Sequence, residues 1–415
     1  MSQSPPPSDR PNHRDDGDAG FASGAADAPV PAPPEPWRPS TMPPVRPGPP
    51  FLMTEMIDAE PNLAVRLIRR LDDASSSAAR LASAVADALA RDEPVVVTGC
   101  GTSEHAALAI AEQIRDAIGN APRVGTVRAA QAFELALDPP TRGLVIGVSH
   151  EGGTAATNRA LEAARHAGAS VGLITAAGSS PGAAEAAPEL VVATEELDQS
   201  WCHTVGYVSP IVVGAIVAAR LADATLDAGA VRELLAAPLR DTLAVERIAS
   251  RLAGVDRLVV VASGVDRATG RELVLKVEEG AALPAAYRDL ETFLHGHLAG
   301  VDERTGLVLV LADRRQRGPR IERSRQLLAA VGALGLPTAA ILAVDVSASI
   351  PADSTTAGRI VVREAPELTA STAALLGTAV PLQLLAERLA RARGRNPDAI
   401  RRDDPRYLAA AAAAE

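Results

Sequence analysis

Two segments of this chain repeat one pattern, in which a strongly apolar run leads directly into a turn of small residues. Residues 95–103 read VVVTGCGTS, and residues 259–265 read VVVASGV, 164 positions further along. The next apolar runs repeat as well, with GLVIGV at 143–148 and GLVLVL at 306–311, which lie 163 positions apart. Two spacings that agree within one residue indicate a duplicated unit. Because ligands bind at the loops after such strands, the repeat also points to a site.

Short β-branched runs alternate with Ala-rich amphipathic stretches through both halves of the chain, which is typical of a parallel sheet covered by helices on both faces. The expected strands are Val95–Thr98, Val124–Arg128, Leu144–Ser149, Ser170–Thr175 and Leu190–Ala193, then Leu258–Ala262, Leu307–Leu311, Thr338–Leu342 and Arg359–Val362. The expected helices include Glu104–Gly119, Gln131–Leu137, Thr154–Ala167, Gly270–Ala282 and Leu376–Ala392. We therefore expect an α/β fold of two parallel-sheet units in tandem.

The chain divides into five expected segments. Fifteen of its 32 prolines fall within the first 50 residues, and such a composition cannot bury enough apolar surface to offset the entropy of ordering. The segments are a disordered tail at 1–52, a helical hairpin at 53–92, sheet units at 93–235 and 236–394, and a polar C-terminal tail at 395–415.

Two loops that follow adjacent expected strands carry hydroxyl groups. The first holds Thr102 and Ser103, and the second reads SHEGGT at 149–154. Small residues let backbone N–H groups converge on an anion at a helix N-terminus, where Ser149 and Thr154 would add hydroxyl donors. A plain strand-to-helix turn with Thr154 as N-cap explains the second loop equally well. Only the pairing of the two loops favours a ligand site.

Several ionisable side chains are candidates for proton transfer or substrate contact. Lys276 and Glu279 lie three residues apart in an expected helix and so share a face, although such a pair is more often a solvated ion pair. His295 lies in an expected loop. An unperturbed histidine, with a pKa of about 6.5, suits proton transfer, yet a lone loop histidine is usually only solvated. His203 and Thr204 are candidates of the same ambiguous kind.

Composition limits the classes of partner. The net charge is −10 without a basic tract, which argues against nucleic acid. No run of about 18 apolar residues lacks charges, so we expect no membrane span, and the absence of a signal pattern leaves the cytoplasm as the expected location. Cys100 and Cys202 form no disulfide framework. Because His295 and His297 have no third ligand nearby, we expect neither a metal nor a cofactor.

The order of these motifs resembles that of a known family, the tandem sugar isomerase (SIS) domains of the glutamine–fructose-6-phosphate aminotransferases. The resemblance is carried by GCGTS at 99–103, by Ser149, Gly152 and Thr154, by Lys276 and Glu279, and by His295–Gly296. It covers about Met53 to Leu408, and Glu279 and His295 lie 16 positions apart, as the family pattern requires. The resemblance implies two flavodoxin-like αβα domains. It also implies isomerisation of an aminated fructose 6-phosphate to glucosamine 6-phosphate.

The resemblance further implies a role for each matching residue. By position, Thr102 and Ser103 would contact the sugar, and Ser149, His150, Glu151 and Thr154 would line the phosphate loop. Glu279 would move a proton between C1 and C2 with help from Lys276, and His295 would help to open the sugar ring. In the family this histidine reaches the neighbouring subunit's site, so a homodimer is implied. Such an isomerisation needs a carboxylate base and stabilisation of an enediol oxyanion.

The chain departs from the family pattern at three places. We expect no glutaminase activity, because the first 50 residues supply no catalytic N-terminal Cys. Glu151 stands where the phosphate loop has a second Ser and Gly153 where it has Glu, and a carboxylate facing a phosphate is unfavourable. The family's C-terminal Schiff-base Lys is replaced by Ala410, which follows PRYLA at 405–409.

Two hypotheses about function follow. The first is an enzyme acting on a phosphorylated sugar or amino sugar, either a ketose/aldose isomerase or an amino-sugar deaminase or aminotransferase-like enzyme. The second is a carbohydrate-derivative-binding module without catalysis, or an isomerase subunit that works with a separate glutaminase. Lys276, Glu279 and His295 favour the first hypothesis, whereas Glu151 and the missing terminal Lys favour the second.

Overall fold

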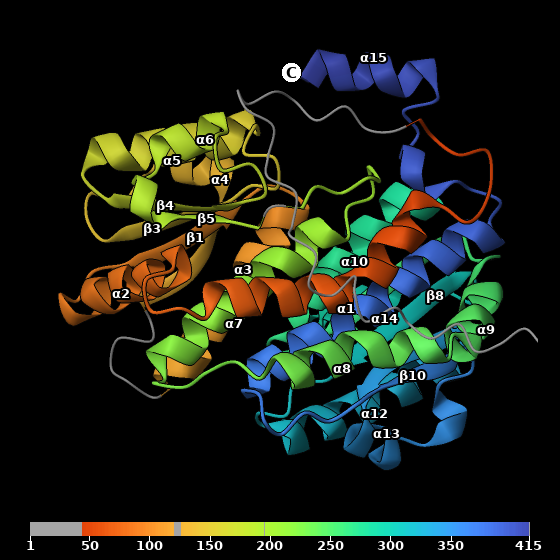
Figure 1. Cartoon of the computed structure of the whole chain (residues 1–415). Coiled ribbons are helices and arrows are strands. Elements are labelled where there is room, and N and C mark those ends of the chain that lie inside the picture. The colour runs from red at the N-terminus through yellow and green to blue at the C-terminus, as the bar shows by residue number, and fades with distance from the viewer. Residues whose placement is uncertain (1–43, 120–125, 195, 415) are drawn as a thin grey trace, which may run out of the picture.

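The computed structural model describes residues 44–119, 126–194 and 196–414. Within these residues, strands form two five-stranded parallel sheets, with helices packed between them and on their outer faces (Figure 1). The expectation of an α/β fold with two parallel-sheet units in tandem is confirmed. Residues 1–43 of the expected disordered tail lie outside the described residues.

The two sheets share one strand order. The first sheet has the order β2-β1-β3-β4-β5, with β1 (Val95–Gly99), β2 (Val127–Gln131), β3 (Leu144–Val148), β4 (Ser170–Thr175) and β5 (Val191–Ala193). The second has the order β10-β9-β8-β6-β7, with β6 (Arg257–Ala262), β7 (Ala285–Asp289), β8 (Thr305–Leu311), β9 (Thr338–Ala343) and β10 (Gly358–Val362). All the paired strands run parallel. Read from β7, the second order matches the first strand by strand, so the repeat in the sequence is a repeat of topology.

Helices cover both faces of each sheet. The core that the sheets share receives α1 (Leu52–Leu71), α2 (Ser77–Ala90), α3 (Thr102–Ile118), α7 (Val205–Leu221), α8 (Ala228–Arg240), α9 (Leu243–Leu252), α10 (Asp266–Ala281) and α14 (Ala370–Ala392). The outer faces carry α4 (Ala132–Leu137), α5 (Ala155–Ala167) and α6 (Pro181–Glu185) on the first sheet, and α11 (Leu290–Leu294), α12 (Arg317–Ala333) and α13 (Val344–Ser349) on the second. The last helix, α15 (Pro405–Ala414), stands apart from the body at the top of Figure 1.

Alternation along the strands divides the apolar side chains among three cores. Val95 and Val97 of β1 face the core shared by the two sheets, whereas Val96 faces α4 and α5 in a separate outer core. In β6, Val260 joins the shared core and Val261 joins the outer core under α12. Successive side chains of a strand point to opposite faces, and both faces are buried here, as is usual in parallel sheets. One continuous core therefore joins the two sheets.

Some expected elements differ from the observed ones. The strand β7 was not expected, because its sequence AAYRD lacks a β-branched run, and it lies half-buried at the edge of its sheet. The strand expected at Val124–Arg128 is observed as β2 at Val127–Gln131. Helices α8 and α9 were also not expected, and the C-terminal segment expected to be a polar tail carries α15.

The packing accounts for the long apolar helix near the end of the chain. Helix α14 is long and apolar enough to cross a membrane, but 89% of its most apolar window is buried inside the fold, where it packs in the shared core.

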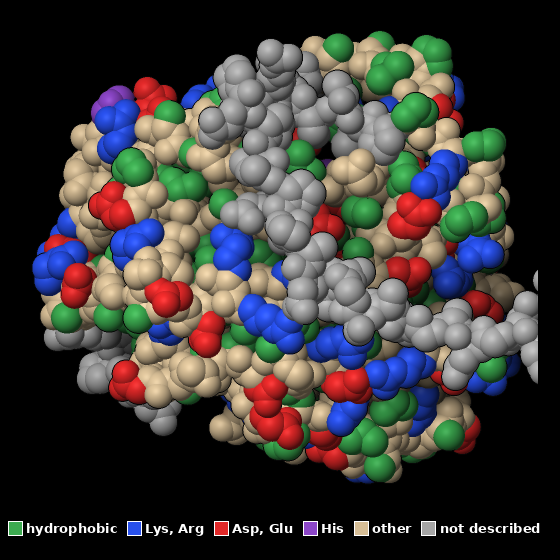
Figure 2. Space-filling view, in the orientation of Figure 1, with side chains coloured by type: hydrophobic (Ala, Val, Ile, Leu, Met, Phe, Trp, Pro, Cys, Tyr) green, Lys and Arg blue, Asp and Glu red, His purple; other side chains and the backbone are tan. Residues whose placement is uncertain are grey.

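Acidic and basic side chains are interspersed over the face seen in Figure 2. The ion pair between Arg388 and Glu246, for example, links α14 to α9.

Candidate functional site

A cavity of about 530 Å³ lies against the loops that follow β1 and β3. These strands are neighbours in the first sheet, with β2 on the far side of β1 and β4 on the far side of β3. The chain therefore leaves them toward opposite edges, which defines the switch point where open parallel sheets bind ligands. The described residues that line the cavity are Cys100, Gly101, Thr102, Ser103, His150, Glu151, Gly153, Thr154, Trp201, His203, Glu279, Ile400 and Arg402.

Glycine at position 99 allows the loop after β1 to turn tightly into α3. A Cβ at Gly99 would lie 2.7 Å from the backbone carbonyl of Ser103, too close for any other residue without a shift of the helix. Gly101 has a φ of 56°, in the left-handed region that glycine enters without strain. As a result α3 begins at Thr102, and its first two side chains, Thr102 and Ser103, lie on the cavity wall.

The loop after β3 depends on Gly152 in the same way. Its φ is 67°, and a Cβ there would lie 1.8 Å from the hydroxyl oxygen of Ser180. Helix α5 then begins at Ala155, with Thr154 in the N-cap position. The side chain of Thr154 makes no capping hydrogen bond, and Thr154 lines the cavity. The capping explanation of this threonine therefore has no hydrogen bond to support it.

Helix α10 brings an ion cluster to the cavity wall. Lys276 is fully buried, and its Nζ donates to Glu279 Oε2 at 2.7 Å and to Thr102 Oγ1 at 2.9 Å. Glu272, also fully buried, lies 3.4 Å from the same Nζ and accepts from the Thr102 hydroxyl at 3.2 Å. Its other oxygen lies 2.7 Å from His105 Nδ1. Of the three α10 side chains in this cluster, Glu279 alone lines the cavity.

Charge pairing outweighs burial inside this cluster. Burial by itself would lower the pKa of Lys276, but the carboxylates of Glu272 and Glu279 raise it above its ordinary value. Burial would likewise raise the pKa of Glu272, but the charge of Lys276 and the contact with His105 hold it below its ordinary value. Both groups are therefore ionised at neutral pH. Burial raises the pKa of Cys202 well above its ordinary value, so this residue, 3.7 Å from Glu279 Oε2, remains a thiol.

Two histidines form the opposite part of the wall. The rings of His150 and His203 are tilted against each other, with centroids 5.0 Å apart. His150 Nε2 accepts the backbone N–H of Asp198 at 2.8 Å, and the carboxylate of Asp198 accepts backbone N–H groups at the start of α7. Burial lowers the pKa of His203 to about 4, so this ring is neutral at physiological pH.

The structure brings together seven of the residues singled out from the sequence. Thr102, Ser103, His150, Glu151, Thr154, His203 and Glu279 all line the one cavity. Lys276 lies behind the wall and contacts it through Thr102 and Glu279. Ser149 and Thr204 are buried away from the cavity: the Ser149 hydroxyl has no hydrogen-bond partner among the described residues, and the Thr204 hydroxyl donates to Asp198.

His295 lies away from the cavity. It follows α11 of the second sheet, its side chain is 71% exposed, and its Nε2 lies 2.6 Å from Glu291. It does not line the cavity of its own chain.

Other residues on the cavity wall or behind it were not singled out from the sequence. Trp201 carried a signal, because it is one of two tryptophans in a chain with 2% aromatic residues. Glu272 carried another, because it precedes Lys276 by four positions on the same helix. Ile400 and Arg402 belong to no recognisable motif, and only the folded chain places them on the cavity.

The corresponding switch point of the second sheet is filled by side chains. The Asp313 carboxylate, just after β8, accepts the backbone N–H of Val265 at 3.2 Å and pairs with Arg315 at 3.1 Å and Arg320 at 2.9 Å. Beside it, Asp266 accepts two backbone N–H groups of the β8 loop. Burial raises the pKa of Asp266 to about 7. The two repeats have thus diverged, and the candidate cavity lies at the switch point of the first sheet.

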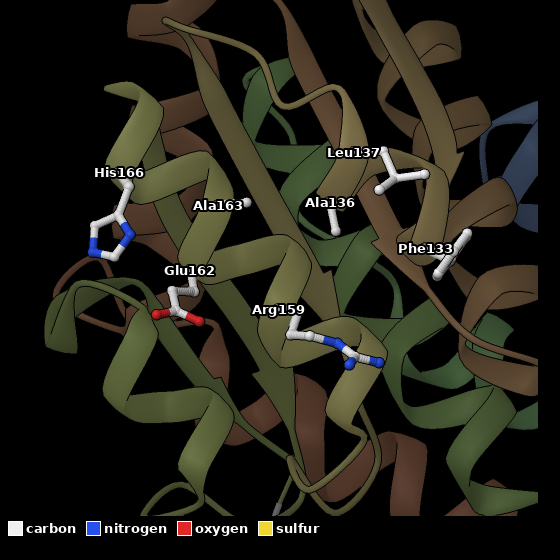
Figure 3. Close-up of a pocket in the computed structure, with 7 residues that line it drawn as sticks. All are labelled: Phe133, Ala136, Leu137, Arg159, Glu162, Ala163 and His166. Atoms are coloured by element: carbon white, nitrogen blue, oxygen red, sulfur yellow. The ribbon is translucent and has the colours of Figure 1, made fainter. Parts of the chain in front are cut away.

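A second hollow, of about 410 Å³, lies between α4 and α5 on the outer face of the first sheet (Figure 3). Phe133 and Leu137 of α4 are exposed on one side, and Arg159, Glu162 and His166 project from successive turns of α5 on the other. Neither strand-end loop contributes to it. Within the described residues, no group of three or more His, Cys, Asp or Glu side chains is placed to hold a metal ion. The cavity at β1 and β3 is therefore the candidate site.

Comparison with known proteins agrees with this location. The family model described as SIS domain matches residues 88–233, which include the first sheet and both of its strand-end loops. No curated protein sequence matches the chain.

Solved structures with the same fold cover most of the chain. The C-terminal domain of glucosamine-fructose-6-phosphate aminotransferase from Francisella tularensis is 18% identical, with a TM-score of 0.69, over 85% of this chain and 98% of that one. A tagatose-6-phosphate ketose/aldose isomerase from Escherichia coli is 20% identical, with a TM-score of 0.69, over 87% and 98%. Glucosamine-6-phosphate deaminase from Thermotoga maritima is 17% identical, with a TM-score of 0.58, over 84% and 97%. The chain therefore contains a SIS domain at residues 88–233, within a two-sheet fold that it shares with these structures.

Proposed function

We propose that this chain binds a phosphorylated sugar or amino sugar in the cavity and catalyses its aldose–ketose isomerisation. One observation supports the proposal most strongly. Glu279 presents a carboxylate to the cavity while a fully buried, charged Lys276 holds it at 2.7 Å. A solvated ion pair would not place its lysine out of contact with water. The structures that share the fold include a ketose/aldose isomerase and a deaminase of sugar phosphates.

In the proposed reaction Glu279 is the catalytic base. Its carboxylate removes the proton from the carbon beside the carbonyl of the open-chain sugar, which leaves an enediolate, and returns the proton to the neighbouring carbon. The hydroxyl proton passes from one enediolate oxygen to the other, so that the carbonyl moves by one carbon. The neutral ring of His203 and the hydroxyl of Ser103, both on the cavity wall, are suited to donate hydrogen bonds to the enediolate oxygens. Lys276 is a positioning residue, because its ammonium contacts Glu279, Glu272 and Thr102 and does not itself line the cavity.

Ring opening would need a further acid or base, and the proposal assigns it to His295 of a second copy of the chain. The exposed side chain of His295 is available to a neighbour. The proposal therefore includes a homodimer in which each chain completes the other's site. Light scattering of the purified chain tests this part, and a monomer that retains full turnover would contradict it.

A second candidate function is binding without catalysis. Glu151 lines the cavity in the loop expected to meet a phosphate, and Ala410 stands where related aminotransferases carry a Schiff-base lysine. A protein that only binds its ligand would tolerate both an acidic residue in this loop and the loss of the Schiff-base lysine.

An isotope-exchange assay separates the two functions. The whole chain is incubated in D₂O with fructose 6-phosphate, tagatose 6-phosphate or glucosamine 6-phosphate, and proton NMR follows both sugar interconversion and deuterium uptake at C1 and C2. Isomerisation through an enediolate predicts deuterium uptake with at least one sugar, and ammonia release from glucosamine 6-phosphate would identify deamination. Saturable binding without exchange would favour the binding module. Binding of none of the three would overturn the proposed function.

A further inference from the structure

A segment near the C-terminus, residues 396–402, lines one side of the cavity and is anchored through Asn396 and Asp398. The Asp398 carboxylate, 1% exposed, accepts the backbone N–H groups of Leu52 and Met53, each at 2.8 Å, and so holds the first turn of α1. The Asp398 carbonyl accepts the backbone N–H of Trp201 at 3.2 Å. The Asn396 side chain donates to the carbonyl of Arg46 at 2.7 Å.

The backbone after this anchor turns sharply. Ile400 has a φ of 40° and Arg401 a φ of 61°, two consecutive residues in the left-handed region, where a β-branched side chain is strained. A conformation of this kind persists where the surrounding contacts over-determine it. Here it turns the chain so that Ile400 and Arg402 both line the cavity. The guanidinium of Arg402 lies over the indole of Trp201, 3.8 Å from the ring centre.

The charges around the cavity make Arg402 distinctive. The acidic and basic residues on the wall, histidines aside, are Glu151, Glu279 and Arg402. Lys276 is held by two carboxylates behind the wall, and His203 is neutral. Among the described residues that line the cavity, Arg402 is the single Lys or Arg. Arg402 is therefore the cationic wall residue that would attract an anionic group on a ligand.

We propose that Arg402, rather than the β3 loop alone, binds the phosphate group of the ligand. This inference rests on the proposed function and adds the residue that selects a phosphorylated over a plain sugar. A guanidinium offers a planar fork of N–H donors that matches phosphate oxygens. Stacking on Trp201 holds that plane at the cavity wall and reduces the entropy lost when phosphate binds. Asp398 is a positioning residue, because it fixes the segment that carries the arginine.

Calorimetric titration of the whole chain tests the inference with two pairs of probes: fructose 6-phosphate with fructose, and glucosamine 6-phosphate with glucosamine. Arg402→Gln should weaken binding of the phosphorylated sugars about 10- to 100-fold, the range for a lost charge-assisted hydrogen bond, and leave the plain sugars unchanged. Arg406→Gln is the matched control, since it removes one arginine from the same region, where Arg406 is exposed and paired with Asp404. It should change neither pair.

Three other outcomes would each overturn the inference. Unchanged affinity for the phosphorylated sugars in Arg402→Gln would overturn the inference while the proposed function stands. An equal loss for plain and phosphorylated sugars would assign Arg402 a structural role and also overturn it. If the unaltered chain binds none of the probes, the proposed function falls and the inference falls with it. Melting temperatures of both variants, measured alongside, confirm that the fold is intact.

Discussion

At the scale of single residues, the fully buried Lys276 is the group on which the candidate chemistry depends. Its ammonium has no water to stabilise it, and two carboxylates on its own helix supply the charge that replaces water. Glu272 is as buried as the lysine, whereas Glu279 is partly open to the cavity. Glu272 therefore meets the lysine inside the fold, whereas the Glu279 carboxylate meets it at the cavity wall.

Replacing Glu279 tests its proposed role as the catalytic base. Glu279→Gln preserves size and removes the base, so turnover of whichever sugar is accepted should fall by roughly two to four orders of magnitude, while binding persists. Glu278→Gln is the control, because Glu278 is exposed on the same helix and accepts only the backbone N–H of Ala285. Steady-state rates and calorimetric affinities are measured for both. Equal rates for Glu279→Gln and the unaltered chain would end the assignment.

Asp266 should make stability depend on pH in an unusual direction. Its pKa is raised by burial to about 7 in the folded chain, whereas an unfolded aspartate titrates near the ordinary value of about 4. Between these values the folded chain binds more protons than the unfolded chain, so this residue's contribution to stability falls as pH rises from about 4 to about 7. Asp266→Asn does not titrate. Its free energy of unfolding, relative to the unaltered chain, should increase by a few kcal/mol from pH 4 to pH 8 in urea titrations, and a pH-independent difference would contradict the assignment.

At the scale of elements, α1 and the segment 396–402 depend on each other. The N-terminal N–H groups of a helix lack partners within it, and Asp398 supplies acceptors for two of them in α1 from 346 and 345 positions away. The carboxylate also stabilises the positive end of the helix dipole. The start of the described fold is thus capped by a residue close to its other end.

Asp398→Asn should loosen both elements. The amide keeps one acceptor and turns an N–H donor toward a backbone N–H, so we expect a loss of about 1–3 kcal/mol in the free energy of unfolding. Trypsin should also cut faster at Arg401 and Arg402. The exposed neighbour Asp403 provides the control, since Asp403→Asn should leave stability and cleavage unchanged. Identical digestion of both variants would show that Asp398 does not hold the segment.

The elements also show what the sequence could and could not predict. Strands such as β1 were placed well because a fully buried β-branched run is distinctive. Helix α7 gave no 3.6-residue pattern, because residues 205–219 are buried on every side. The loops that form the cavity wall were found as contiguous motifs. Arg402 was not, since its place depends on a hydrogen bond between Asp398 and α1, and tertiary contacts at such separation leave no local pattern.

At the scale of the whole molecule, the two repeats share both a core and a site. The shared core contains side chains from both sheets and from α1, α7 and α14, so neither sheet has a separate inner core. The cavity is composite as well: its loops belong to the first sheet, and Glu279 comes from the helix after β6 of the second. The first repeat supplies the loops expected to bind the ligand, and the second supplies the proposed base.

A shared core predicts a single unfolding transition. Leu375→Ala removes a fully buried side chain from α14 in the shared core, and Leu327→Ala removes one from α12 in the outer core of the second sheet. Each should cost about 2–5 kcal/mol, and each should move one common calorimetric transition to lower temperature. Two separated transitions, or a shift in only part of the signal, would show that the sheets unfold independently.

The composite cavity also bears on synthesis. A ribosome makes the β1 and β3 loops early, but α10 emerges more than a hundred residues later, and the segment with Arg402 emerges nearly last of the described chain. Domains of growing chains commonly fold from the N-terminal side first. A nascent first sheet would therefore present an open pocket without its carboxylate base or its arginine. On this view a prematurely terminated chain that stops before residue 396 has the loops of the site and Glu279 but lacks Arg402, the residue proposed to select phosphorylated sugars.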